Sequence, residues 1–323
     1  MSLPPLVMTC GEPAGIGPEL AAKAWDQLRA RLPFAWIGDP THLPAGTPVA
    51  EIATPEDARH ASVSALPVLT HHFEGPAKPG HPDPAHAAGV IAVIARAVQL
   101  TMQGAAAGIC TAPIHKKALQ DGAGFAYPGH TEYLAALAGV DRVVMMLACD
   151  ALRVVPVTIH IPLAEVPERL TAALLTDTIL ITHRALIRDF GIAGPRLAVS
   201  GLNPHAGEGG AMGTEEAEMI VPVLDALRRE GLDIRGPLSA DTMFHAGARA
   251  GYDAAIAMYH DQALIPIKTL DFAGGVNLTL GLPFVRSSPD HGTAFDIAGT
   301  GTADVTSTLN ALRMADRLAR TRA

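Results

Sequence analysis

The segment RLAVSGLNPH (residues 196–205) is an apolar run that closes on a histidine, and two further segments have the same pattern. They are RVVPVTIH (residues 153–160) and AAIAMYH (residues 254–260). Each apolar run is typical of a buried β-strand. The runs therefore predict three strands that end close to His160, His205 and His260.

Ligands of open α/β sheets bind just beyond the carboxyl ends of the strands. Three imidazoles delivered to that edge would converge on one metal ion if the strands are neighbours. A single histidine at a strand end is usually a polar loop residue, so the shared placement of three favours a metal site. An all-imidazole set suits Zn²⁺, Co²⁺, Ni²⁺ or Mn²⁺ better than Mg²⁺, and three protein ligands leave coordination positions open for catalysis. Asp241 and Asp261 are the nearby candidates for orienting the rings.

Composition places the chain among soluble globular proteins. It has 323 residues, of which 49% are hydrophobic and 17% charged, enough for two domains or one large α/β unit. The net charge of −8 and the lack of a dense Lys/Arg tract argue against a nucleic-acid partner. Three scattered cysteines without a CxxC pair are typical of a reducing compartment. Because we find no signal peptide and no apolar stretch of the roughly 18–20 residues that a membrane span needs, we expect a cytoplasmic protein without a membrane partner.

Strand-like and helix-like runs alternate along most of the chain, which predicts an α/β fold with a mostly parallel sheet covered on both faces. Two strand-like runs, residues 143–149 and 152–160, lie so close together that they predict a hairpin. In a long helical segment near residues 214–231, Thr214 is the expected N-cap and the glutamates of the first turn complement the helix dipole. Three other long amphipathic segments predict helices at residues 18–32, 86–104 and 171–191.

A glycine-rich loop, GEPAGIGPE (residues 11–19), follows a strand-like run and opens a helix. This context suits a turn that contacts a phosphate or a ligand through its backbone. The spacing GxxxGxG differs from GxGxxG, and no Gly-Lys-Ser/Thr follows, so neither the Rossmann fingerprint nor the Walker A motif is present. A tight turn that needs a positive φ explains the glycines equally well.

Polar and basic residues follow the third histidine in an apolar, Gly/Pro-rich setting: Lys268, Asn277 and Arg286. Lys and Arg near a metal are natural clamps for a carboxylate or a phosphate, although an isolated surface lysine is usually ordinary solvated charge. His130 and Thr131 start a predicted helix, whose N-terminus is a preformed anion site. The segment HGTAFDIAG (residues 291–299) predicts a loop-to-helix junction whose glycines permit close backbone approach to a ligand.

Seven blocks of the sequence together resemble the family of 4-hydroxythreonine-4-phosphate dehydrogenases, and they recur in order over nearly the whole chain. The blocks are GEPAGIGPEL, TAPIHKKAL, GHTEYLA, GLNPHAGEGG, GPLSADTMF, AMYHDQALIPIK and GVNLTLGLPFVRSSPDHGTAFDIAGTG. The resemblance implies a three-layer α/β/α fold like that of isocitrate and isopropylmalate dehydrogenases, not a Rossmann domain, with two domains and a cleft between them. We expect an outer domain at residues 1–127 plus 285–323. Residues 128–284 would form a central domain with the metal histidines and the dimer interface.

The resemblance also assigns roles to residues of this chain. It implies a homodimer whose metal site is shared between subunits, with one divalent metal per site, Zn²⁺ being favoured over Co²⁺, Mn²⁺ or Mg²⁺. Metal ligands fall on His160, His205 and His260. Substrate contacts fall on His130, Thr131, Lys268, Asn277 and Arg286, and contacts to NAD (or NADP) on Gly292, Thr293 and Ala294. Catalytic candidates are Asp241, Asp261 and Lys268; Asp241, Asp261 and a metal-bound hydroxide remain open as the general base.

The implied reaction is oxidation of the C3 hydroxyl of 4-phosphooxy-L-threonine, a phosphorylated hydroxy amino acid, during pyridoxal 5′-phosphate biosynthesis. Its product, 2-amino-3-oxo-4-phosphobutanoate, would lose CO₂ to give 3-amino-2-oxopropyl phosphate. Three alternatives stay open. A sister dehydrogenase would act on phosphorylated threonate or erythronate or on a cis-dihydrodiol, a phosphate acyltransferase of similar fold would need no metal, and a non-catalytic module would only bind phosphate esters.

Overall fold

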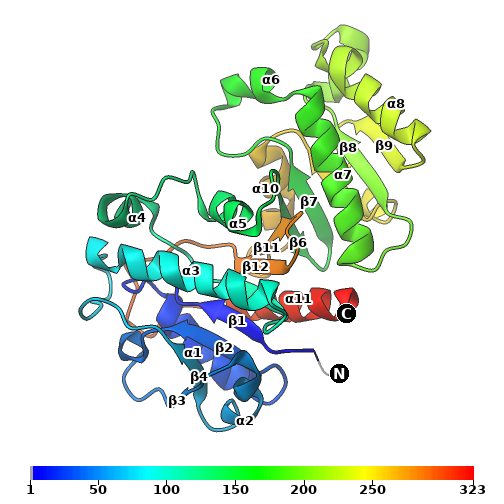
Figure 1. The fold of residues 1–323 in the computed structure, drawn as a ribbon. Coiled ribbons are helices and arrows are strands. Elements are labelled where there is room, and N and C mark those ends of the chain that lie inside the picture. The colour runs from blue at the N-terminus through cyan, green and yellow to red at the C-terminus, as the bar shows by residue number, and fades with distance from the viewer. Residues whose placement is uncertain (1–2) are drawn as a thin grey trace. The chain divides into compact units, whose positions relative to one another are not determined.

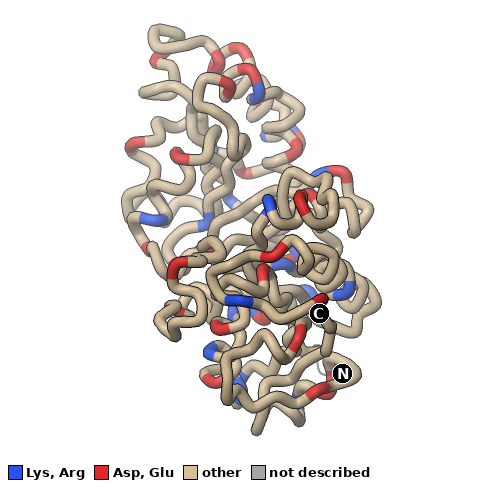
Figure 2. The backbone as a smooth tube through the Cα atoms, turned by 90° about the vertical axis from the view of Figure 1, so that its left-hand side faces the viewer, with Lys and Arg blue, Asp and Glu red and all other residues tan. Residues whose placement is uncertain are grey.

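A computed structural model describes residues 3–323, and the chain folds into two compact units. The first unit runs up to Val143 and resumes at Leu282, and the second comprises Val144–Gly281. The chain thus leaves the first unit once and returns to it once. Lys and Arg are interspersed with Asp and Glu along the described backbone (Figure 2).

The first unit contains a sheet of six parallel strands in the order β3-β4-β2-β1-β5-β12. Its central strands are fully buried, as their apolar sequences predict. The strands are β1 (Leu6–Thr9), β2 (Phe34–Gly38), β3 (Val49–Glu51), β4 (Leu66–Thr70), β5 (Gly108–Thr111) and β12 (Val285–Pro289).

The helices of the first unit are α1 (Gly17–Leu28), α2 (Ala58–Ala61), α3 (Ala87–Met102), α4 (Lys116–Ala123), α5 (His130–Ala138) and α11 (Thr306–Arg322). Helices α1, α2, α3 and α11 pack on the strands of this unit, and α4 and α5 pack on α3 (Figure 1). Helix α1 has Pro18 in its first turn, where the missing N–H costs nothing. The C-terminal helix α11 packs on β12, and Ser287 Oγ donates a hydrogen bond to the carbonyl of Ala311.

The second unit is built on the strand order β11-β6-β7-β10-β8-β9. Strands β6 and β7 form the predicted antiparallel hairpin, and β11 pairs antiparallel with β6. The pairs β7–β10, β10–β8 and β8–β9 are parallel. The strands are β6 (Val144–Cys149), β7 (Leu152–Pro156), β8 (Arg196–Ser200), β9 (Asp233–Leu238), β10 (Ala254–Ala257) and β11 (Val276–Leu280). The prediction of a mixed α/β fold is confirmed.

The helices of the second unit are α6 (Val166–Arg169), α7 (Ala172–Arg188), α8 (Val221–Arg229), α9 (Ala246–Arg249) and α10 (His260–Leu270). Thr171, the first residue of the predicted helix, caps α7, because its side chain accepts a hydrogen bond from the Leu174 N–H. The segment predicted to be one helix after Thr214 instead starts with a π-helical turn, Glu216–Ile220, before α8 begins. Helix α10 packs on β6, β7 and β10 and buries Ala263 and Ile267 in the core.

The expectation that no apolar stretch is long enough to span a membrane was wrong for one helix. Residues Pro84–Met102 form a 19-residue helical stretch with a mean hydropathy of 1.4, long and apolar enough by composition. In the structure, however, 44% of that stretch is buried, and α3 packs on β1, β2 and β5. These contacts are those of a core helix, whose apolar residues cover a sheet.

Replacing Ile94 in α3 tests this core role. Its side chain is 1% exposed, so Ile94→Ala should lower the free energy of unfolding by about 2–5 kcal/mol in urea titrations. Met102→Ala, at a position 51% exposed on the same helix, is the matched control and should change it by less than about 0.5 kcal/mol. Equal effects at the two positions would contradict the packing of α3 as described.

Candidate active site

The three strands that carry the candidate metal histidines are neighbours. Strand β10 pairs in parallel with β7 on one side and β8 on the other. His160, His260 and His205 follow the carboxyl ends of β7, β10 and β8 within a few residues. The sequence of the second unit therefore brings all three to one edge of one sheet, the edge at which α/β proteins bind ligands.

Two of these histidines lie side by side. The ring centroids of His160 and His260 are 5.6 Å apart. His260 is the first residue of α10, and its Nδ1 lies 2.7 Å from Oδ1 of Asp261. A carboxylate on Nδ1 fixes the ring and leaves Nε2 to bind a ligand or a metal. The pair borders a pocket of about 250 Å³, which is lined by Thr158, Ile159, His160, Ile161, Leu163, Val166, Tyr259, His260 and Asp261.

Gln262 ties together two of the strand ends. Its Oε1 accepts hydrogen bonds from Ser200 Oγ (2.8 Å) and from the Met258 N–H (2.7 Å). Its Nε2 donates to the carbonyl of Gly201 at 2.9 Å. These hydrogen bonds of Gln262, two residues after His260 in α10, join the end of β8 to the end of β10.

His205 sits in a loop with left-handed backbone geometry. The φ angles of His205, Ala206 and Glu208 are 53°, 51° and 42°, and the intervening Gly207 is also left-handed. A left-handed residue that carries a Cβ costs roughly 1–2 kcal/mol, so contacts elsewhere must hold this loop. The His205 side chain is exposed in the single chain.

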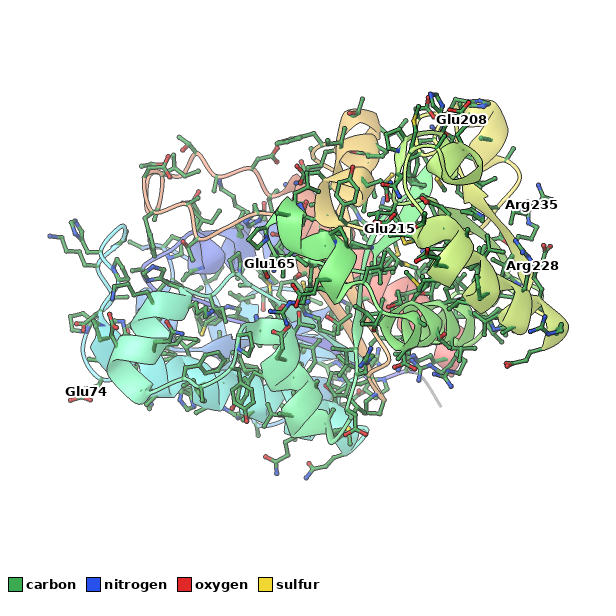
Figure 3. The ribbon with its side chains drawn as sticks, turned by 90° about the horizontal axis from the view of Figure 1, so that it is seen from above. Glu74, Glu165, Glu208, Glu215, Arg228 and Arg235 are labelled. Atoms are coloured by element: carbon green, nitrogen blue, oxygen red, sulfur yellow. The ribbon has the colours of Figure 1, made fainter. Side chains whose placement is uncertain are left out.

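The contacts that hold the loop come from Glu216, in the π-helical turn. Its Oε1 accepts hydrogen bonds from the backbone N–H groups of Leu202 and Asn203, each at 2.8 Å. The Asn203 side-chain amide donates to Glu216 Oε2 (3.0 Å) and to Glu215 Oε2 (2.7 Å). Figure 3 labels Glu208 in this loop and Glu215 at the start of the segment that follows it.

Among residues 3–323 no group of three or more His, Cys, Asp or Glu side chains is arranged to hold a metal. The single chain thus brings His160 and His260 together but does not assemble the complete set with His205. The three-histidine ligand set stays a prediction.

In the first unit, the buried Arg286 lies near the half-buried His130. Arg286, on β12, is 6% exposed and donates through Nε and Nη2 to Thr111 Oγ1 at 3.1 and 2.6 Å. Burial lowers the pKa of Arg286 to about 10. His130 begins α5, followed by Thr131, and burial together with the nearby Arg286 charge holds the pKa of His130 well below its usual range. The buried Nε2 of His130 has no hydrogen-bond partner in the described part of the chain.

The other predicted substrate and base residues lie in the second unit. Asn277, on β11 opposite Leu147 of β6, has a buried Oδ1 without a partner among the described residues. Lys268, on α10, places Nζ 5.3 Å from the ring centroid of Phe272. Asp241 is exposed and accepts a hydrogen bond from Ser239 Oγ at 2.6 Å. Of the two candidate bases, Asp261 is the one that contacts a candidate metal histidine, His260.

The glycine-rich loop borders a second cavity, of about 490 Å³, in the first unit. The N–H of Ile16 donates to the carbonyl of Thr293 at 3.0 Å, and a Cβ on Gly15 would lie 2.9 Å from that same oxygen. Gly292, Thr293 and Ala294 therefore belong to a loop that packs on the glycine-rich turn, with Ala294 in the left-handed region at φ 45°. The cavity is lined by Pro13, Gly15, Pro18, Glu19, Thr41, His42, Leu43, Pro44, Ala45, Ala77, Pro79, Gly299, Thr300 and Gly301.

Sequence reasoning missed three residues of this arrangement: Gln262, Glu216 and Thr111. Gln262 follows His260 and Asp261 directly, which was the available signal for a supporting role. The first-turn glutamates were assigned to the helix dipole, whereas Glu216 points back to the His205 loop. Thr111 offered no local signal, because its partner Arg286 is 175 residues away in sequence.

The fold and site define an α/β protein with paired histidines at the carboxyl edge of a sheet and a separate glycine-lined cavity. The family model of "Pyridoxal phosphate biosynthetic protein PdxA" matches residues 32–315. The chain therefore belongs to the PdxA family, whose named relatives are oxidoreductases.

Relatives named 4-hydroxythreonine-4-phosphate dehydrogenase match nearly the whole chain. The protein from Roseobacter denitrificans is 64% identical over 98% of this chain and 97% of its own, and that from Paracoccus denitrificans is 64% identical over 98% of each. The crystal structure of the Klebsiella pneumoniae enzyme of this name has a TM-score of 0.88 at 35% identity, covering 98% of this chain and 99% of that chain. A terephthalate 1,2-cis-dihydrodiol dehydrogenase from Burkholderia xenovorans has a TM-score of 0.68 at 28% identity, covering 97% and 98%.

The depressed pKa of His130 predicts how stability depends on pH. The pKa of His130 is lower in the folded chain than in the unfolded chain, where it is about 6.5. Above about pH 6.5 the ring is neutral in both states, so its protonation does not reduce the free energy of unfolding. As the pH falls from there toward the pKa of the folded chain, the unfolded chain binds a proton that the folded chain does not, and stability is lost. The unfolding free energy should therefore decrease from pH 7 to pH 5, and less steeply in His130→Asn.

Denaturant titrations at several pH values measure this slope. His60→Asn, at an exposed histidine of the same unit, is the control and should leave the slope unchanged. A His130→Asn variant with the unaltered slope would contradict the lowered pKa of His130.

Proposed function

We propose that the chain catalyses NAD-dependent, divalent-metal-dependent oxidation of the C3 hydroxyl of 4-phosphooxy-L-threonine. The product would be 2-amino-3-oxo-4-phosphobutanoate, in the pathway to pyridoxal 5′-phosphate. The observation that carries this proposal is the His160–His260 pair at the edge where β7, β10 and β8 end. The names of relatives that are 50–64% identical over nearly the whole chain support the choice of substrate.

The donor chemistry at this edge fits a divalent metal. Two imidazoles lie together, one ring is held through Nδ1 by Asp261, and a third imidazole follows the neighbouring strand. His160, His205 and His260 would hold the ion, with Zn²⁺ favoured and Co²⁺, Mn²⁺ or Mg²⁺ as alternatives. What a bound divalent ion supplies is a positive charge that lowers the pKa of a coordinated hydroxyl.

The charged ends of the substrate need fixed partners. Arg286 and His130 offer buried N–H donors, and Asn277 and His130 each have a buried polar atom with no partner among the described residues. We assign Lys268, Asn277, Arg286, His130 and Thr131 to the phosphate and carboxylate. Holding both ends fixes C3 for hydride loss, and such positioning removes several kcal/mol from a barrier.

The hydride acceptor is assigned to the first unit. The glycine-rich loop and the loop that contains Gly292, Thr293 and Ala294 pack against each other beside a cavity of about 490 Å³, large enough for part of a dinucleotide. NAD⁺, or NADP⁺, would accept the hydride. Backbone groups at the glycines can approach such a ligand closely because no Cβ intervenes.

A base must take the hydroxyl proton. Both candidate aspartates are exposed, but Asp261 contacts the candidate metal ligand His260, whereas Asp241 accepts a hydrogen bond from Ser239. The contact with His260 supports Asp261 as the base. Lys268 is also kept as a catalytic residue, because its positive charge would lie beside the substrate carboxylate that is later lost as CO₂. The oxidised product is a β-keto acid, and loss of CO₂ from it would yield 3-amino-2-oxopropyl phosphate.

The proposed assembly is a homodimer that shares the metal site. Support comes from the exposed apolar side chains of α10 and the turn after it, since Ile265 is 62%, Leu270 39% and Phe272 79% exposed in the single chain. Exposed apolar residues gathered on one element are typical of a subunit interface. We also propose a cytoplasmic location, in keeping with Cys10, Cys110 and Cys149, which are buried and unpaired.

A sister activity on a cis-dihydrodiol is the second candidate. It is supported by the similarity to a terephthalate 1,2-cis-dihydrodiol dehydrogenase at 28% identity. A branched-chain phosphotransacylase from Enterococcus faecalis, at 16% identity and a TM-score of 0.58 over 97% of this chain and 99% of its own, shares the fold alone.

An assay of NAD⁺ reduction tests the proposal. 4-Phosphooxy-L-threonine should be oxidised with a kcat/KM at least about a hundredfold above that of terephthalate cis-dihydrodiol, which has no phosphate and would leave the buried phosphate partners unpaired. It should also be oxidised faster than 4-phosphoerythronate, which has a hydroxyl in place of the amine. Chelation should abolish the reaction, and added Zn²⁺, Co²⁺ or Mn²⁺ should restore it.

Faster turnover of the dihydrodiol would favour the sister activity. Full activity after metal removal, verified by elemental analysis of the protein, would refute the metal-dependent mechanism.

A further inference from the structure

The direction of His205 is set by an unusual piece of backbone. From His205 to Gly210 every residue has a positive φ, with angles of 53°, 51°, 77°, 42°, 67° and 99° in order. His205 is the first residue of this left-handed turn, so its Cα–Cβ vector depends on the turn being kept. The loop is attached to β8 through Gly201, Leu202 and Asn203.

One buried carboxylate holds that attachment. Glu216 is 5% exposed, and its Oε1 accepts from two consecutive backbone N–H groups, those of Leu202 and Asn203. Its Oε2 accepts from the Asn203 side-chain amide. A carboxylate that receives three N–H donors makes strong, charge-assisted hydrogen bonds and fixes their directions.

Three glycines leave the space that this carboxylate and its amide partner occupy. A Cβ on Gly201 would lie 2.9 Å from Glu216 Oε1, and one on Gly207 would lie 2.7 Å from Oε2. A Cβ on Gly213 would lie 2.3 Å from Asn203 Nδ2. The loop is therefore packed around the Glu216–Asn203 pair on both sides of His205.

We propose that Glu216 is a positioning residue for the metal site: it presets the left-handed turn so that His205 is delivered ready to bind the ion. This inference rests on the proposed function, because it takes His205 as a metal ligand. It predicts that the loss of the Glu216 carboxylate weakens metal binding through geometry, although Glu216 itself does not touch the metal.

The test compares Glu216→Gln with Glu218→Gln in the full-length protein. Both remove one negative charge from the same turn, but Glu218 is exposed, whereas Glu216 is buried against the loop. In Glu216→Gln the new side-chain amide would turn an N–H donor toward donors of the loop, so the loop should lose its preset geometry. We expect Co²⁺ affinity, titrated by visible absorption and calorimetry, to fall about tenfold or more in Glu216→Gln, with a changed Co²⁺ spectrum, and to stay within about twofold in Glu218→Gln.

Gly207→Ala separates geometry from charge. It leaves all carboxylates in place but sets a methyl group against Glu216 Oε2 in a left-handed position, so it should weaken Co²⁺ binding similarly. Unchanged Co²⁺ affinity and spectrum in Glu216→Gln would overturn the proposal, as would a loss in Glu216→Gln that Gly207→Ala does not share. If Glu216→Gln does not fold, Asn203→Ala takes its place and must lower the affinity at least about threefold.

His205→Ala distinguishes a failure of the proposed metal site from a failure of the positioning role of Glu216. If His205→Ala keeps full Co²⁺ affinity, the proposed metal site itself fails. If His205→Ala loses the metal while Glu216→Gln retains it, only the positioning role fails.

Discussion

The structure depends on the parallel pairing of β10 with both β7 and β8. This pairing fixes the strand ends within one sheet, so residues far apart in the sequence reach a common edge. Buried apolar side chains fix the register, and Val154, Ala198 and Ala255 lie beside one another in a single core cluster. A slip by one residue would turn every side chain to the other face, so the core and the site are specified together.

Around that edge the chain departs from regular structure, and each departure has an identifiable support. His260 stands at the start of α10 with Asp261 on its ring, Gln262 ties two strand ends together, and Glu216 holds the left-handed loop. None of these contacts is needed to bury the core. Their common effect is to fix the strand ends, the backbone of the His205 loop and the ring of His260, which lowers the entropy lost when a ligand binds.

Much of this could be predicted from the sequence. The mixed α/β fold and the hairpin of β6 and β7 follow from apolar runs and turn spacing. The adjacency of β7, β10 and β8 was only a condition of the histidine hypothesis, and the strand pairing of the structure supplies it. The π-helical turn at Glu216 and the left-handed loop could not be predicted, because both are set by hydrogen bonds between segments, which local propensity does not encode. The Arg286–Thr111 contact was hidden for the same reason. The apolar length of α3 was missed in the sequence, and its packing on β1, β2 and β5 is that of a core helix.

The central claim is that two copies of the chain complete one metal site, and a heterodimer tests it most directly. His205→Ala and His260→Ala chains with different affinity tags can be co-expressed and the doubly tagged dimer purified. If His205 and His260 of one site come from different subunits, the heterodimer keeps one intact site of two and should show about half the wild-type rate of NAD⁺ reduction, whereas each variant homodimer shows none. A doubly tagged dimer as inactive as either homodimer would contradict the shared site.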